Sequence, residues 1–472
     1  MTFSSIPWLE LAILFPFVGA VWVFFVRARD VARSHQQSFC WGTFVFAFIA
    51  WILSVGSTSR TNEPQEMISL TRGFFAIDEF SAPLIPLAAL LWLMAALGTL
   101  GTKPKQYSFS GNLLSEAITI ATLSCTHAWG IIILLGLAIV PTYSDLRTRG
   151  RSPRVFLVHM LLFIGMLTLG WSFVDAENPK ESHSAIAVAL LMGGIFIRCG
   201  VAPLHCWMTD LFENASLGTS LLFVTPMTGT YAAVRLLFPI ASESQLHFLV
   251  LMGIFTSVYA AGMSLVQTEA RRFFCYLFLS HSALVLVGLG IATPVGLTAA
   301  LCIWLSVGLA LAGFGMTLRA LEARLGRLSL REYHGLYENM PRVAVFFLLT
   351  GLASVGFPGT VGFVATELLV DGAVQAYPWI GMLVVVAATL NGIAVVHAYF
   401  RLFTGRQHAV SVPIRSRPRE LTTVLIMSAL ILLGGIMPQP GIASRYSAAT
   451  ELLRKKGILP SPHASNWTKN AN

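Results

Sequence analysis

Apolar segments of about 20 residues recur along this chain from one end to the other, and this repetition limits its fold more than any other feature. A helix of that length crosses the hydrocarbon core of a bilayer, because each residue adds about 1.5 Å. Only 11% of the 472 residues are charged and the mean hydropathy is +0.72. No polar block is long enough to form a separate soluble domain. The sequence therefore predicts an all-α, multi-pass membrane protein.

The apolar runs predict about fourteen spans. They are residues 7–26, 38–56, 80–101, 111–127, 128–144, 155–174, 184–202, 219–240, 247–266, 273–292, 295–318, 341–374 with a break inside, 379–404 and 420–437. The first run has no basic segment before it and is followed by Arg27, Arg29 and Arg33, the reverse of a cleavable signal peptide. We expect it to remain as the first span.

Basic residues collect in alternate loops, which orients the chain because lysine and arginine stay on the cytoplasmic side. With the N-terminus outside, the loops predicted to lie inside hold Arg27, Arg29, Arg33, Lys103, Lys105, Arg147, Arg149, Arg151, Arg154, Arg271, Arg272, Arg319, Arg324, Arg327, Arg331, Arg401, Arg406, Arg415, Arg417 and Arg419. Residues 175–181 and 242–247, predicted outside, are acidic or neutral, while the basic tail at 454–456 is an exception. We therefore attribute the net charge of +9 to the orientation of the chain in a cell inner (plasma) membrane and not to nucleic-acid binding.

Two spans are interrupted by residues that end helices. The first break follows Arg198, where Gly200, Pro203 and His205 stand together, and the second covers residues 356–362, with Glu367 one to two turns later. If spans four to eight and nine to thirteen form two five-helix units, each unit is broken in its fourth helix, which is typical of inverted repeats with an ion path at the breaks. A simpler interpretation is that Arg198 reaches to the headgroups from a helix end that Pro203 terminates.

This pattern predicts three parts. Residues 1–110 form N-terminal helices, residues 111–404 form the repeated core, and residues 405–472 form a last helix and tail.

The six cysteines include no C-x-x-C pair, so we expect no disulfide and no metal. Cys199, Cys206 and His205 are three nominal metal ligands at the first break, too few without a second cluster. No glycine-rich nucleotide motif or cysteine cluster predicts a cofactor.

Four motifs are more specific than the span pattern. They are Pro203-Leu204-His205-Cys206-Trp207 with Asp210; Thr228-Gly229-Thr230-Tyr231 with Arg235; Gln267 to Tyr276, which includes Arg271 and Arg272, followed by Ser280-His281; and Gly356-Phe357-Pro358-Gly359 with Gly362, Phe363 and Glu367. From about residue 78 to residue 401 the chain resembles the antiporter-like, proton-conducting membrane subunits of respiratory complex I, Mrp antiporters and membrane-bound hydrogenases. Residues 140–143 are most similar to the subunit M type.

The resemblance implies a proton path that starts at a glutamate in the fifth helix and a lysine in the seventh. It continues over further lysines or histidines to an acid or lysine in the broken twelfth helix. In this sequence Gly136, Arg198, Met227 and Val307 stand at four of these positions, and only Glu367 is retained. A guanidinium does not give up its proton in a protein, so Arg198 is expected to act as a fixed positive charge.

Groups that titrate must then lie elsewhere on the proposed path. Glu116 and His127 are candidates in the field of Arg198, each with the alternative of an ordinary interfacial or core residue. His281 lies inside a span, where a helix-to-helix hydrogen bond explains it equally well, and His205 lies at the first break. Glu367 is expected to be buried, and an isolated buried carboxyl takes up a proton rather than stay charged.

The resemblance and the breaks together favour one function over two others. The favoured function is proton translocation by a non-redox subunit of a complex I-type NADH:quinone oxidoreductase, driven by quinone chemistry in other subunits. Whether such a subunit counts as an enzyme by itself is left open. One alternative is a non-conducting structural paralogue, favoured by the lost charged residues. The other is a secondary transporter, either alone or as a subunit of a cation/proton antiporter or inorganic-carbon uptake system. Except for a stand-alone transporter, these functions place the chain among other membrane subunits.

Overall fold

The computed structural model describes residues 6–58, 73–99, 107–174, 184–405 and 418–460. Within these ranges the chain is helical, and its extended pairings are two isolated bridges, Phe75 with Cys125 and Glu269 with Ser329. Nine helical segments of these ranges are long and apolar enough to cross a membrane. The predicted all-α, multi-pass class is confirmed. The predicted loop at 175–181, Lys103, Lys105 and much of the tail lie outside the described residues.

The first half of the chain forms helices that follow the predicted spans closely. They are α1 (Trp8–Phe25), α2 (Arg29–Thr58), α3 (Leu84–Leu97), α4 (Phe109–Ser124), α5 (Ala128–Leu137), α6 (Ile139–Thr148), α7 (Arg154–Ser172), α8 (Ala185–Cys199), α9 (Cys206–Asn214), α10 (Leu217–Val224), α11 (Thr228–Ala232) and the π-helical η3 (Ala233–Leu237). Helix α2 begins at Arg29 and not at residue 38, because its first turns are polar and fall below a hydropathy threshold while remaining helical.

The second half contains longer helices. They are α12 (Glu243–Val266), α13 (Ala270–Ile291), α14 (Pro294–Leu325), α15 (Pro341–Val355), α16 (Val361–Ala376), α17 (Pro378–Phe403), α18 (Pro418–Ile436) and α19 (Gln439–Lys456). Every predicted span coincides with one helix or with consecutive helices. The count of about fourteen, the inverted repeat and the three-part division remain predictions.

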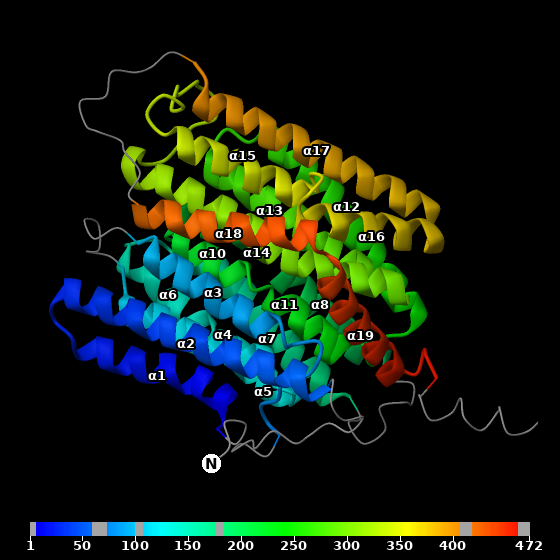
Figure 1. Cartoon of the computed structure of the whole chain (residues 1–472). Coiled ribbons are helices and arrows are strands. Elements are labelled where there is room, and N and C mark those ends of the chain that lie inside the picture. The colour runs from blue at the N-terminus through cyan, green and yellow to red at the C-terminus, as the bar shows by residue number, and fades with distance from the viewer. Residues whose placement is uncertain (1–5, 59–72, 100–106, 175–183, 406–417, 461–472) are drawn as a thin grey trace, which may run out of the picture.

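The helices lie side by side in a bundle, with α1 and α2 along one edge and α17 along the opposite edge (Figure 1). Helices α13 and α14 form its centre: the hydrophobic segment of α13 is entirely buried, and α14 contacts α3, α10, α13, α15, α16, α18 and α19. Phe273 to Ile291 are buried on all sides of α13. A helix that is apolar all round belongs in such an interior position.

The sequence did not predict α19, which is polar overall and crosses the ends of the other helices (Figure 1). Arg445 in its middle is 1% exposed and donates to the carbonyl oxygens of Phe80 at 3.1 Å and Glu79 at 2.7 Å. At its end, Lys456 donates to the carbonyl of Phe238 at 2.7 Å. These bonds fasten the C-terminal helix to the connection before α3 and to the end of η3.

Candidate functional site

The first break lies between α8 and α9. Gly200 takes the left-handed conformation with φ of 69°, and its N–H and that of Val201 return to carbonyls of α8, which ends the helix. Trp207, one residue into α9, turns back and donates its indole N–H to the carbonyl of Ile197 at 2.6 Å. The motif around Pro203 and Trp207 therefore builds a closed turn in which a side chain satisfies a freed carbonyl.

The structure contains a further break that the sequence analysis missed, between α10 and α11. Thr225, Pro226 and Met227 separate the two helices, and Met227 has a φ of 53°. Pro226 in the middle of an apolar run was the available signal, because proline removes a helical N–H donor and clashes with the preceding turn. The π-helical η3 follows at once, so the eighth predicted span is irregular over most of its length.

Arg198 lies where these two breaks meet. Its Nη2 donates to the carbonyl of Phe223 at 3.1 Å and to the hydroxyl of Thr228 at 2.9 Å, on opposite sides of the α10–α11 break. The guanidinium lies over the ring of Phe223 at 4.1 Å and that of Trp207 at 5.6 Å. The side chain is 5% exposed, so it does not reach toward headgroups. In the described part of the chain no carboxylate forms an ion pair with it.

A glycine makes room for this arginine. A Cβ atom on Gly229 would lie 2.7 Å from Cγ of Arg198 and 3.1 Å from Sγ of Cys199. Both distances are shorter than normal contacts, so α8 and α11 approach this closely only with glycine here. Met227, which stands at the position of a family lysine, is buried in the break between α10 and α11. The acceptors of Arg198 are a backbone carbonyl and a hydroxyl, not a carboxylate.

Gly136 and His127 were also named on the proposed path. A Cβ atom added at Gly136 would meet only Ile164 within 4 Å, so Arg198 does not lie against this glycine. His127 is exposed at the start of α5 and stacks on Phe74 at 5.3 Å, so it is a surface residue. The structure therefore favours the interfacial alternative for His127.

Glu116 is fully buried in α4, and its neighbour is not Arg198. Its Oε2 accepts a hydrogen bond from the thiol of Cys40 in α2 at 3.1 Å. Its Oε1 accepts none from the described residues. The structure therefore places this carboxyl between the N-terminal helices and the core, apart from the first break.

His205 and His281 are both interior groups. His205 is 8% exposed and lies between the rings of Tyr259 at 5.4 Å and Tyr276 at 5.8 Å, and its Nδ1 has no partner among the described residues. His281 is 4% exposed, and its Nδ1 lies 2.8 Å from the carbonyl of Leu277. Val307, at a family histidine position, is buried in α14.

The second break, between α15 and α16, matches the prediction at Pro358 and Gly359. Gly356 has a φ of 97°, which favours glycine, and the N–H of Phe357 returns to the carbonyl of Leu352. Glu367 lies in α16, but it is exposed on the surface of the chain. The expectation of a buried carboxyl is therefore wrong for the isolated chain, because residue 367 falls on the outward stripe of the helix.

The remaining motif residues join elements of one end of the bundle. Arg271 forms an ion pair with Glu322 of α14 and donates to the carbonyls of Phe212 and Ala215, so it links α13 and α14 to the α9–α10 connection. Arg272 pairs with Glu213 at 3.2 Å. Asp210 accepts from Asn214 at 2.9 Å. Both arginines therefore hold parts of this end of the bundle together.

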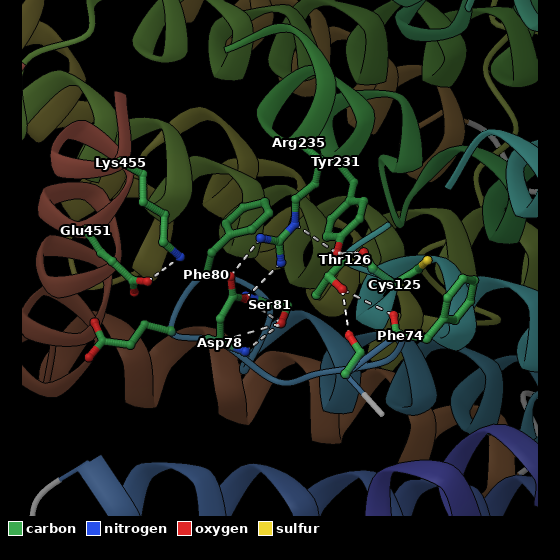
Figure 2. Close-up of polar contacts among 12 residues, drawn as sticks. Phe74, Asp78, Phe80, Ser81, Cys125, Thr126, Tyr231, Arg235, Glu451 and Lys455 are labelled. Atoms are coloured by element: carbon green, nitrogen blue, oxygen red, sulfur yellow. Dashed lines mark hydrogen bonds and ion pairs between the residues drawn. The ribbon is translucent and has the colours of Figure 1, made fainter. Parts of the chain in front are cut away.

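A cluster around Asp78 was not recognised from the sequence (Figure 2). Arg235 of η3 forms two bonds to the Asp78 carboxylate, at 2.7 and 2.9 Å, and its Nε donates to the hydroxyl of Tyr231 at 3.1 Å. Tyr231 donates in turn to the carbonyl of Cys125 at 2.9 Å, and Ser81 donates to Asp78 at 2.7 Å. The cluster holds the connection before α3 against the end of the irregular eighth span.

Comparison with known proteins agrees with this geometry. Residues 156–391, half of the chain, match the family described as NADH:quinone oxidoreductase/Mrp antiporter, transmembrane region. The chain belongs to this family. It is 23% identical to NAD(P)H-quinone oxidoreductase chain 4 of Prochlorococcus marinus strain NATL2A, over 97% of this chain and 93% of that protein. It is also 23% identical to NADH-quinone oxidoreductase subunit M of Pseudomonas aeruginosa, over 92% and 94% of the two chains.

Solved structures show the same fold. A chain of the Mrp complex from a Dietzia species superposes with a TM-score of 0.81 at 19% identity, covering 98% of this chain and 100% of that one. A chain of respiratory complex I from Thermus thermophilus gives 0.80 at 21% identity, covering 95% and 99%. The sequence-based recognition of an antiporter-like membrane subunit is confirmed.

Proposed function

We propose that this chain is a proton-translocating membrane subunit of a complex I-type NADH:quinone oxidoreductase, without a redox centre of its own. Membership of the family and the names of its relatives, chain 4 and subunit M, support the assignment. The observation that carries it is Arg198, a permanent charge held inside a membrane bundle where two helices are interrupted. Such a charge is costly in a membrane and marks ion paths.

In this proposal Arg198 supplies a fixed positive potential, and other groups bind the moving proton. His205 beside the first break and His281 beyond it are interior titratable groups, and Glu367 follows the second break. An arginine cannot release a proton under these conditions, so it controls the energy of a proton nearby and does not carry one. The path thus runs from the first break toward α16.

The exposure of Glu367 favours an assembly over a single subunit. A carboxylate that faces lipid from a membrane helix is costly, and polar groups at such depth face protein or water instead. We infer that a neighbouring membrane subunit covers this side of α16. The structures of similar fold come from multi-subunit membrane complexes, which supports such partners.

A non-conducting structural paralogue is the second candidate. Three substitutions favour this candidate. Where the family resemblance implies charged or titratable groups, this chain has Gly136, Met227 and Val307. The near-equal similarity to the Mrp chain also keeps a cation/proton antiporter assembly as an alternative. Purification of the native complex separates the antiporter assembly from the other two candidates, because copurifying subunits with flavin and iron–sulfur centres are expected only for a complex I-type assembly. Proton uptake by variants of this chain then separates a conducting subunit from a structural paralogue.

Glu367→Gln tests the path in the assembled complex. We expect it to lower proton uptake into reconstituted vesicles by about tenfold or more, because the amide cannot bind the proton, while assembly is unchanged. Asp371→Asn is the matched control, since Asp371 lies one turn further on the same exposed face and is bonded to Gln375. Normal proton uptake in Glu367→Gln, or equal losses in both variants, would remove Glu367 from the path.

The orientation with the N-terminus outside a cell inner membrane is also part of the proposal. Single cysteines introduced at Arg149 and Arg327, in a background where Cys206 is replaced, should react with membrane-impermeant maleimide only from the cytoplasmic side. Both positions lie in basic connections between helices, and lysine and arginine favour that side. A cysteine at Glu243, at the opposite end of α12 from these connections, should react only from outside. Labelling of position 149 from outside contradicts this orientation.

A further inference from the structure

The fully buried carboxyl of Glu116 lies at one end of a polar stripe between α2 and α4. Its Oε2 is held by the Cys40 thiol at 3.1 Å, while its Oε1 receives no hydrogen bond from the described residues. Gln36 lies one turn before Cys40 on α2 and is also fully buried. Its Oε1 likewise receives no hydrogen bond from the described residues. Two unpaired acceptors thus occur in successive turns of the same helix pair.

The stripe continues from Gln36 toward Tyr107, which lies two residues before the start of α4. The Nε2 of Gln36 donates to Oδ1 of Asn112 at 2.7 Å and to the hydroxyl of Tyr107 at 3.4 Å. Asn112 and Tyr107 are partly exposed, whereas Gln36, Cys40 and Glu116 are not exposed at all. Residues 36 and 40 on α2 face residues 112 and 116 on α4, and four helical residues advance roughly 6 Å. The polar groups therefore lead stepwise from the surface to the middle of α4.

Ordinary packing does not explain this arrangement. The other buried positions of this stripe on α2 are Ala32, Ala47 and Ala50, which have no polar side-chain group, and Thr43, whose hydroxyl donates to the carbonyl of Phe39 in its own helix. A buried acceptor left without a donor costs about 1–3 kcal/mol, so two in adjacent layers are expensive. Internal water removes this cost in proteins, since each buried molecule makes about three hydrogen bonds to such groups.

We propose that α2 and α4 form a hydrated proton inlet in which water joins Gln36 Oε1 to Glu116 Oε1. The Cys40 thiol holds Oε2 and leaves Oε1 free for the water. A hydronium ion arriving along the stripe gives one proton to Oε1 and becomes water, and the reverse transfer releases it. The inlet opens on the side of the membrane where Tyr107 lies. Its role in pumping rests on the proposed function, but its existence does not.

Infrared spectroscopy of the complex in lipid tests the inlet directly. The carboxyl signal of Glu116 is the one that disappears in Glu116→Gln, and its shift on transfer to D2O measures proton exchange at that residue. We expect prompt exchange in the wild-type complex. In Gln36→Leu exchange should slow by about tenfold, because a water hydrogen bond is lost. Thr43→Val is the control, since this buried hydroxyl further along α2 bonds only to its own helix at Phe39.

Proton uptake is measured on the same samples, so that failure of the inlet can be distinguished from failure of the proposed proton-translocating function. Equal exchange rates in wild type and Gln36→Leu overturn the inlet, as does a Glu116 signal that responds to neither pH nor D2O. Prompt, Gln36-dependent exchange in a complex that takes up no protons supports the inlet and contradicts the proposed function. Normal proton uptake with slow wild-type exchange at Glu116 contradicts the inlet alone.

Discussion

Replacing Asp78 by asparagine is expected to lower the free energy of unfolding by about 3 kcal/mol, the lower end of the range for breaking a buried ion pair. The side chains of Arg235 and Asp78 are only 13% and 20% exposed, so the arginine left behind remains a largely buried, uncompensated charge. Thermal unfolding of the purified subunit or complex, followed by tryptophan fluorescence, measures the loss. The double variant Asp78→Asn with Arg235→Met should recover part of it, because no charge is then left unpaired. An unchanged melting temperature in Asp78→Asn contradicts the prediction.

The same ion pair predicts how stability depends on pH. Burial alone would raise the pKa of Asp78, but Arg235, together with hydrogen bonds from Ser81, holds that pKa at about 2. A carboxyl whose pKa is lower in the folded state contributes stability that is fully present above its unfolded pKa of about 3.9. That contribution is lost as the pH falls toward 2. Wild-type protein should therefore lose stability in this acidic window, and Asp78→Asn should lack this component of the loss.

Replacing Arg198 by methionine is expected to reduce proton uptake by at least about tenfold with little loss of assembled complex, because one buried charge shifts a nearby protonation equilibrium by 1.4 kcal/mol or more. Methionine is shorter than arginine, but its apolar side chain can still pack against the rings of Phe223 and Trp207. It leaves the carbonyl of Phe223 without its donor, which costs about 1–3 kcal/mol and offsets the gain from removing an unpaired cation.

The lysine variant separates charge from packing at the same position. Arg198→Lys keeps a positive charge and regains a group that burial can deprotonate, so proton uptake should be retained or improved. Thr228→Val is a matched control, because it removes one acceptor of the guanidinium without removing the charge. If Arg198→Met assembles normally and transports protons normally, the two breaks are not the centre of an ion path.

Local sequence signals were sufficient for the apolar helices and for two of the three breaks. Hydropathy places the spans because it is a property of consecutive residues. Pro203 and Pro358, each close to a glycine in the left-handed conformation, mark the two predicted breaks, although Pro16 and Pro141 lie within helices. Pro226 carried the same signal, but the apolar residues on both sides concealed it. The polar helix α19 has no hydropathy signal at all.

The partners of the charged residues could not be predicted in the same way. Arg198 bonds to groups 25 and 30 residues away, Cys40 meets Glu116 over 76 residues, and Asp78 meets Arg235 over 157. Such contacts depend on how the helices pack and on how each helix is rotated about its own axis. A uniformly apolar helix has no apolar stripe, so its sequence does not predict that rotation. For the same reason Glu367 was expected inside the chain, although it lies on the outward face of α16.

The bonds from Arg445 to the carbonyls of Glu79 and Phe80 span 366 and 365 residues, most of the length of the chain. A ribosome must therefore add more than 360 residues after Phe80 before the connection that carries Asp78 receives the contacts from Arg445. Until then the ends of α3 and η3 must remain in place without the C-terminal helix. Loss of α19, by a premature stop codon or by proteolysis before residue 439, would remove these contacts at this end of the bundle while leaving the apolar helices up to α18 intact.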